Sequence, residues 1–255
     1  MIEGWLGDGG SDVLVIEHRF SRCELRREAN EVVVWLPAAT LLLRHASSPA
    51  TAPEAPYDFD PELGSYRRRY TVAGSLRALG ETLAHEVQTL VDRYFERPPG
   101  VSPVLTREAS GLPRPSELRA PGRFTLAMRN LAQSRTLEDR RLVYQAFVNG
   151  TLLAPLRRPE HGDAPLQMLP AEQAESGASV WAVFTNWDDA AQWRRSSGQE
   201  AKPWAIFSGL QLMALATRER PSSILLNPGG SVGGEFLSHE LDRLAEALHL
   251  SRPSA

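Results

Sequence analysis

Apolar residues recur at steps of three and four along the segment after Ser75, which is the spacing of one face of an α-helix. The stripe consists of Leu76, Leu79, Leu83, Val87, Leu90, Val91 and Tyr94. Ser75 can cap the start of this helix, and Pro98 and Pro99 end the pattern. The sequence therefore predicts one long helix that buries a single face.

The pattern before this helix is that of β-strands. Short segments rich in β-branched residues alternate with turn-forming residues. These segments are 13–17, 23–26, 32–36, 41–44 and 67–72. Strands with one apolar face need a covering layer, and the long helix can supply it. We therefore expect an antiparallel sheet plus a long helix, an α+β arrangement, in the first half.

The second half alternates between helical and strand patterns. Helices are predicted at 125–133, 136–150, 187–195, 209–219 and 239–250. Strands are predicted at 151–154, 166–169, 180–185 and 223–226. Thr136, Asn186 and Ser238 are suited to cap three of the helices. This alternation predicts a mixed α/β sandwich with some parallel pairing.

Proline content suggests where the chain divides. The segment 96–123 holds six prolines and has no sustained periodicity, which is typical of a linker. A second polar stretch, 46–64, has the composition of a long loop. We therefore predict an α/β (α+β) chain with two domains, an α+β domain at 1–97 and an α/β domain at 124–255, joined by a Pro-rich linker at 98–123.

Composition narrows the function classes. The chain has 255 residues and a net charge of -3, so no overall field attracts nucleic acid or an anionic membrane. The single cysteine, Cys23, cannot form an internal disulfide, although the neighbouring Arg22 could activate it as a nucleophile. No signal peptide or membrane-length apolar run is visible. We expect a cytoplasmic protein with no nucleic-acid partner and no membrane partner.

One basic stretch tests that expectation. The run Tyr66 to Tyr70 reads YRRRY and could stack on single-stranded nucleic acid. Arginines also protect the edge strand of a sheet against pairing with another chain. The negative net charge favours the edge-strand interpretation.

The segment ILLNPGGSVGGEF, Ile224 to Phe236, contains the pattern G-x-S-x-G around Ser231. That pattern is the nucleophile elbow of many hydrolases, in which a strand leads directly into the serine. Here Asn227 and Pro228 intervene, and both histidines after Ser231 lie on one predicted helix. An acid and a base on one short helix do not easily converge on the same serine. No catalytic residue is therefore assigned.

Two other interpretations of this segment remain. A phosphate-binding loop needs Lys and Ser or Thr behind its last glycine, but Glu235 and Phe236 stand there. A turn that ends a strand fits better, because Pro228 fixes φ and Gly229 accepts a positive φ. We therefore expect a glycine-rich surface loop that could bind a ligand or a partner.

The histidines do not have the spacing of a metal site. None of the six forms H-x-x-x-H or H-E-x-x-H. No metal ligand is assigned, and no cofactor is expected.

The order of motifs in the second half resembles the SseB N-terminal domain family. The motifs are RNLAQSRTLEDRRLVYQAFVNGTLLAPL (129–156), VFTNWDDAAQW (183–193) and ILLNPGGSVGGEFLSHELDRL (224–244). The resemblance covers roughly 127–250 and does not extend to the first half. It implies a bacterial cytoplasmic α/β domain without catalytic residues or a cofactor. The names given to the family connect it with enhanced serine sensitivity and with type III secretion.

These observations lead to a protein-interaction or adaptor function with an unidentified protein partner. The candidate binding residues are Thr185, Trp187, Asn227, Pro228, Gly229, Ser231 and Glu235. One alternative is a homodimeric protein resembling a secretion chaperone, with the first-half helix packed between protomers. Another is a small-ligand or hydrolase domain that uses the 227–236 loop.

Overall fold

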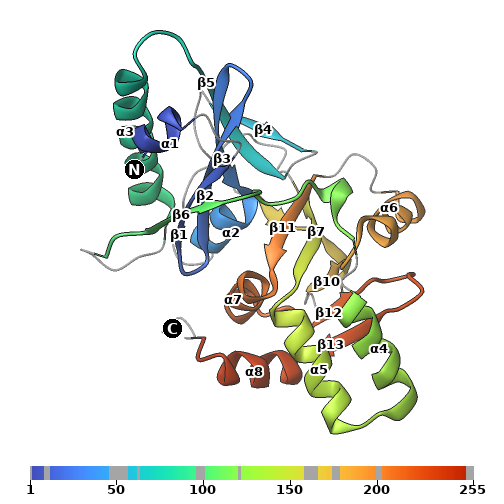
Figure 1. The fold of residues 1–255 in the computed structure, drawn as a ribbon. Helices are drawn as coiled ribbons and strands as arrows, with labels where there is room; N and C mark the ends of the chain where they lie inside the picture. The colour runs from blue at the N-terminus through green and yellow to red at the C-terminus, as the bar shows by residue number, and fades with distance from the viewer. Residues whose placement is uncertain are drawn as a thin grey trace. The chain divides into compact units, whose positions relative to one another are not determined.

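The computed structural model describes residues 2–8, 12–45, 57–61, 64–95, 101–119, 122–157, 166–173, 179–198 and 203–250 (Figure 1). The chain forms two compact units: unit 1 is Met1–Asp60 with Gly64–Pro113, and unit 2 is Pro61–Leu63 with Arg114–Ala255. Helices and strands occur in both units, so the predicted α/β class is confirmed. The predicted domain boundaries at 97/98 and 123/124 stay predictions.

Unit 1 is built on one antiparallel sheet of six strands (Figure 1). In spatial order these are β4 (Asp58–Asp60), β5 (Ser65–Thr71), β3 (Glu31–Pro37), β2 (Ser21–Glu28), β1 (Val13–His18) and β6 (Val104–Glu108). Every neighbouring pair is antiparallel, as predicted for the first half. Strand β6 was not predicted, because it lies inside the proline-rich segment.

The long helix predicted for unit 1 is α3 (Leu76–Tyr94). Ser75 caps it by accepting a hydrogen bond from the Ala78 N–H at 3.5 Å. Its apolar stripe is buried within unit 1 from Leu83 to Tyr94, with Leu83 fully inaccessible to solvent, whereas Leu76 at its start is 40% exposed. The short helix α1 (Ile2–Gly7) packs against α3, where a Cβ at Gly80 would lie 2.7 Å from Glu3 Cγ. A chaperone-like dimer packed through this stripe would therefore have to expose it first.

The prediction of a strand at 41–44 is wrong, because these residues belong to helix α2 (Ala38–His45). Pro37 ends β3, since it cannot donate a hydrogen bond to a neighbouring strand. The following Ala and Leu residues are strong helix formers. A short run of consecutive apolar residues is compatible with either structure when all are buried, as the leucines here are.

Unit 2 contains a mixed sheet and a smaller antiparallel one (Figure 1). The mixed sheet has the order β13 (Gly234–Leu237), β12 (Ser223–Leu226), β10 (Ser179–Val183) and β9 (Pro170–Gln173). The smaller sheet has the order β11 (Trp204–Ser208), β7 (Thr151–Arg157) and β8 (Gln167–Met168). Strands β10 and β12 are parallel, which confirms the predicted mixed arrangement. A bridge between Leu153 and Phe184 connects the two sheets.

Helices flank these sheets. They are η1 (Pro115–Glu117), α4 (Gly122–Ser134), α5 (Leu137–Val148), α6 (Trp187–Ser196), α7 (Gly209–Glu219) and α8 (Ser238–Ala247). Thr136 and Asn186 cap α5 and α6 as predicted. Ser238 does not cap α8: it is the first helical residue, and the Leu237 N–H donates to the Glu240 carboxylate at 3.1 Å.

Candidate functional site

Two of the predicted binding residues meet where the parallel strands β10 and β12 end. Asn227 Oδ1 accepts a hydrogen bond from the Thr185 N–H at 2.8 Å. Asn227 Nδ2 donates to Thr185 Oγ1 and to the Val232 carbonyl, each at 3.0 Å. Thr185 is 2% exposed and Asn227 is 3% exposed. The Asn227 amide is therefore committed to bonds within the protein, and it ties the two strand ends to the following loop.

Backbone geometry explains why asparagine and glycine occupy this turn. Asn227 has φ 44° and Gly229 has φ 76°, in the left-handed region where these residue types are best tolerated. The Asn227 carbonyl accepts from the Gly230 N–H at 2.8 Å. A Cβ at Gly230 would lie 2.8 Å from the Asp189 carboxyl carbon, so the loop approaches α6 closely. The predicted turn with a positive φ at Gly229 is confirmed.

The start of α6 closes against this turn. Asn186 Oδ1 accepts from the Asp189 N–H at 2.9 Å, and Asn186 Nδ2 donates to Asp189 Oδ2 at 2.8 Å. Trp187, the next predicted binding residue, is half-buried and contacts Trp204 edge to face at 5.8 Å between ring centroids. Trp193 also contacts Trp204. Both α6 tryptophans thus belong to one aromatic cluster beside the sheet.

The remaining predicted residues do not converge on one another. Gly229, Ser231 and Glu235 are exposed, and Pro228 is half-buried. Within the described part of the chain, neither the Ser231 hydroxyl nor the Glu235 carboxylate takes part in a hydrogen bond or ion pair. Glu235 lies on β13 opposite Leu225, so the predicted loop at 227–236 ends in a strand. That part of the loop prediction is wrong, since β13 completes a hairpin with β12.

A different surface feature lies on the hairpin of α4 and α5. The inner faces of both helices are buried through Phe124, Met128, Val143 and Phe147. Between their outer faces runs a groove of about 390 Å³. It is lined by Arg123, Leu126, Ala127, Asn130, Leu142, Gln145, Ala146 and Asn149. We call these residues the α4–α5 groove.

The leucines at this groove remain in contact with solvent. Leu126 is 59% exposed and Leu142 is 42% exposed. Leu137, at the start of α5, is 78% exposed. Isolated exposed leucines are normal, but two that line the same groove are typical of an interaction surface.

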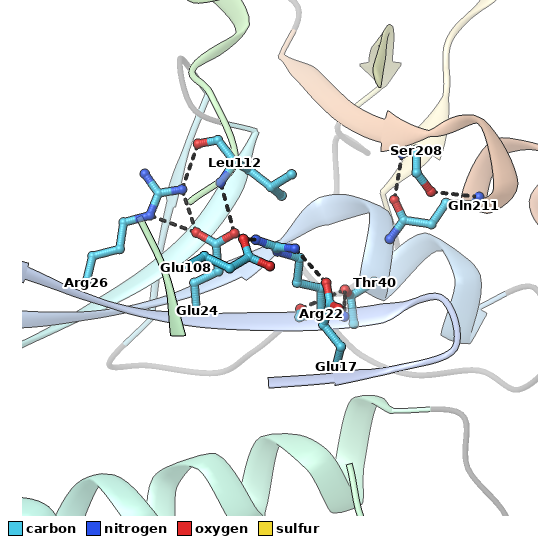
Figure 2. A network of polar contacts seen from close by, with 9 residues as sticks. All are labelled: Glu17, Arg22, Glu24, Arg26, Thr40, Glu108, Leu112, Ser208 and Gln211. Atoms are coloured by element: carbon cyan, nitrogen blue, oxygen red, sulfur yellow. Dashed lines mark hydrogen bonds and ion pairs between the residues drawn. The ribbon is translucent and has the colours of Figure 1, made fainter. Parts of the chain in front are cut away.

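Unit 1 contains a buried charge cluster around Glu24, whose side chain is 1% exposed (Figure 2). Arg22 Nε donates to Glu24 Oε1 at 2.7 Å, and Arg26 Nε donates to Glu24 Oε2 at 2.8 Å. The Leu112 N–H donates to Glu24 at 3.0 Å, while Arg26 donates to the Leu112 carbonyl at 2.8 Å. The cluster fastens the segment after β6 onto the sheet.

The charge state of this cluster follows from its surroundings. Burial by itself would lower the pKa of Arg22, but the Glu24, Glu108 and Glu17 carboxylates raise it above the usual value. Arg22 therefore stays a cation bonded to three carboxylates. Burial raises the pKa of the neighbouring Cys23, which is inaccessible to solvent, so its thiol stays protonated rather than becoming a nucleophile.

The basic run on β5 is neutralised within unit 1. Arg67 pairs with Asp60 at 2.9 Å, Arg68 with Glu86 at 2.7 Å, and Arg69 with Glu31 at 2.6 Å. The three arginines that could bind phosphate groups are therefore already paired with carboxylates of the same chain. The interpretation of this run as an edge strand is wrong, because β5 lies between β3 and β4.

No group of three metal-ligating side chains occurs among the residues described in the structure.

Comparison with known families identifies the second half. Residues 125–243 match the model of the SseB protein N-terminal domain. The C-terminal half carries an SseB-family domain. The match agrees with the resemblance predicted over roughly 127–250. No curated protein and no solved structure shows a significant match to the chain.

The matched range places both candidate features in the SseB domain. It contains the Asn227 junction and all of the α4–α5 groove except Arg123.

Across the described segments, no helix is both long and apolar enough to cross a membrane.

Sequence reasoning found the junction and missed the groove. Each of the two helices has a leucine outside its buried stripe: Leu126 beside Phe124 and Met128, and Leu142 beside Val143 and Phe147. The sequence signal for the groove was therefore an apolar residue on each helix outside its buried apolar stripe. It could not be assigned before the structure showed which face each helix buries.

Proposed function

We propose that this chain is a non-catalytic protein-interaction module of the adaptor type, acting in a bacterial cytoplasm. Its partner is a protein, and the binding surface is the α4–α5 groove of the SseB domain. The observation that carries the proposal is the set of leucines left in solvent around a groove, on helices whose other faces already form the core.

The chemistry of the two candidate features supports this choice. At the Asn227 junction the polar atoms that would orient a small ligand are already bonded to Thr185 and Val232. At the groove the accessible surface is mostly apolar, and its polar lining residues are Arg123, Asn130, Gln145 and Asn149. An apolar centre with polar groups around it is the usual composition of a protein interface.

The extent of the apolar surface favours a protein over a small molecule. Leu126 and Leu142 line the groove yet are 59% and 42% exposed, so a ligand smaller than the groove would leave part of both side chains in water. A folded partner segment can cover both while also filling the groove. Burying apolar area of this kind contributes about 25 cal/mol per Å² before the costs of association.

Site-specific photo-crosslinking in the host cell tests the proposal. A diazirine amino acid at position 126 or 142 should yield the same covalent protein adduct, identified by mass spectrometry. The matched control is position 76 on α3, where Leu76 is also exposed, at 40%. Failure to obtain an adduct at both groove positions, or the same adducts from position 76, would overturn the proposal.

A further inference from the structure

We propose that the α4–α5 groove receives an acidic amphipathic helix of a partner protein. This inference rests on the proposed function and adds the chemistry of the partner. It is carried by the shape of the groove and by the distribution of charge around it.

The groove has the form that a third helix needs. Its lining includes Ala127 from α4 and Ala146 from α5, and such small side chains allow a partner to approach closely. Leu126 and Leu142, which are more exposed, also line it, one from each helix. The lining residues cover positions 123–130 and 142–149, which correspond to about 10 Å along each helix at 1.5 Å per residue. Apolar residues at i, i+3, i+4 and i+7 of a partner helix span about the same length and can face the groove.

The charge on the hairpin differs in sign from that of the chain. The hairpin from Gly122 to Val148, including the turn between its helices, contains five arginines and two carboxylates, a net charge of +3, whereas the whole chain has a net charge of -3. None of the residues that line the groove is acidic. A complementary partner is therefore acidic.

The two carboxylates of the hairpin are already engaged. Glu138 pairs with Arg141 at 3.9 Å, and Asp139 accepts from the Thr136 hydroxyl at 2.6 Å. Arg140 lies 3.8 Å from Glu240 on α8. The hairpin thus has no unengaged carboxylate to neutralise its other arginines.

Two of the three arginines that remain flank Leu126 on α4. Arg123 and Arg129 lie three residues before and after Leu126, so both are its neighbours on the surface of α4. Arg135 lies between the two helices. Among the described residues these three side chains make no ion pair or hydrogen bond. Carboxylates on both sides of a partner's apolar stripe would supply the missing counter-charges.

A second copy of this chain fits the same surface less well. Pairing two grooves would bring two sets of unpaired arginines together, and like charges at a close interface are unfavourable. The charge pattern therefore favours a different, acidic protein over self-association.

Binding of designed peptides to the full chain tests the inference. The probe is a fluorescent helical peptide of four turns with Leu at i, i+3, i+4 and i+7 and Glu at most other positions. One control peptide has Lys in place of Glu, and a second has the same composition with the Leu spacing scrambled. We expect the Glu peptide to bind at least about tenfold more tightly than either control at low salt. Its affinity should fall severalfold as ionic strength rises and the Debye length shortens.

Variants of the chain separate charge from shape. The double variant Arg123→Glu/Arg129→Glu should lose at least about tenfold in affinity for the Glu peptide and should gain affinity for the Lys peptide. A role in folding alone would not reverse the preference in this way. The double variant Arg194→Glu/Arg195→Glu, at the end of α6, changes the net charge equally and should leave both affinities unchanged. Leu142→Asp should abolish binding of the Glu peptide.

Three results would overturn the inference. The first is equal affinity for the Glu, Lys and scrambled peptides. The second is no peptide binding while crosslinks at positions 126 and 142 persist, which would leave the proposed function standing. The third is a dimer in sedimentation that Leu142→Asp disrupts, because a second copy would then occupy the groove.

Discussion

Helix α3 of unit 1 and the α4–α5 hairpin of unit 2 use apolar residues in opposite ways. On α3 the stripe from Leu83 to Tyr94 is buried against its own unit. On the hairpin one face is buried in the same manner, but Leu126 and Leu142 remain outside. Helix α3 buries its stripe from Leu83 onward and leaves Leu76 of its first turn 40% exposed, whereas the hairpin leaves two leucines in solvent that line the same groove.

Charged groups show the same contrast. Glu24 in unit 1 is buried and bonded to Arg22, Arg26 and the Leu112 N–H. On the hairpin, Arg123 and Arg129 make no such bonds within the described segments. The Glu24 carboxylate of unit 1 is therefore paired within its own unit, whereas Arg123 and Arg129 of the hairpin are available to the carboxylates of another molecule.

The largest expected effect concerns the buried charge. Glu24→Gln should cost about 3–5 kcal/mol in the free energy of unfolding, because the largely buried Arg26 would lose its carboxylate partner and Arg22 would lose one of its three. Arg129→Gln on the hairpin should stay within about 0.5 kcal/mol, as for other surface substitutions. Urea unfolding followed by circular dichroism measures both. Equal losses of stability from the two substitutions would contradict the difference between the buried charge of unit 1 and the exposed charge of the hairpin.

The next comparison is between a buried leucine of α3 and an exposed leucine of the hairpin. Leu83→Ala on α3 should cost about 2–5 kcal/mol, since it removes buried methyl groups and leaves a cavity. Leu126→Ala should change stability by no more than about 0.5 kcal/mol, because its side chain is already 59% exposed. The same unfolding measurement applies. A large loss for Leu126→Ala would mean that the hairpin surface belongs to the fold.

The Asn227 junction gives an intermediate effect. Asn227→Ala should cost about 1–3 kcal/mol, because the buried Thr185 N–H and the Val232 carbonyl lose their partner. Ser231→Ala, four residues along the same loop, is the matched control and should be neutral. The comparison fails if the two substitutions have equal effects on the denaturation midpoint.

The smallest effect concerns Tyr144 on α5, whose hydroxyl donates to Glu240 at 2.7 Å. Burial, together with this bond and the nearby charge of Glu240, raises the pKa of Tyr144 to about 12. The folded chain holds this proton more tightly than the unfolded chain, where the tyrosine pKa is about 10. The stabilisation is therefore complete below pH of about 10 and is lost as the pH rises through about 12.

Ultraviolet titration of phenolate absorbance measures this pKa as the difference between the wild type and Tyr144→Phe. The pH dependence of stability in the alkaline range should weaken in the variant. A Tyr144 that titrates with the exposed tyrosines would contradict the expected contact.

Local pattern was sufficient for much of the fold. The stripe on α3, the caps at Thr136 and Asn186 and the turn at Gly229 were predicted from residues that are neighbours in the chain. Such features depend on backbone preference and on periodicity, which are properties of short segments. The motifs of the second half were also sufficient for the SseB-family prediction.

Errors arose where the partner of a segment decided its structure. Residues 41–43 are consecutive buried leucines, so they show no alternation, and the segment 41–44 is helix rather than strand. Strand β6 was hidden by prolines around it, and β13 by the glycines before it. Both of these strands are defined by pairing with β1 and β12, so no local signal determined them.

The sequence by itself determined the α/β class, the long helix of unit 1, the family of the second half and the turn at Asn227. Only the tertiary structure decided that the Asn227 amide makes its hydrogen bonds within the protein and that the side chains of Leu126 and Leu142 remain exposed to solvent. The physical reason is that the identity of a hydrophobic residue does not determine whether its side chain is buried. Burial depends on which surfaces pack together in the folded chain. A leucine available to a partner can therefore be recognised only once the residues of the core are known.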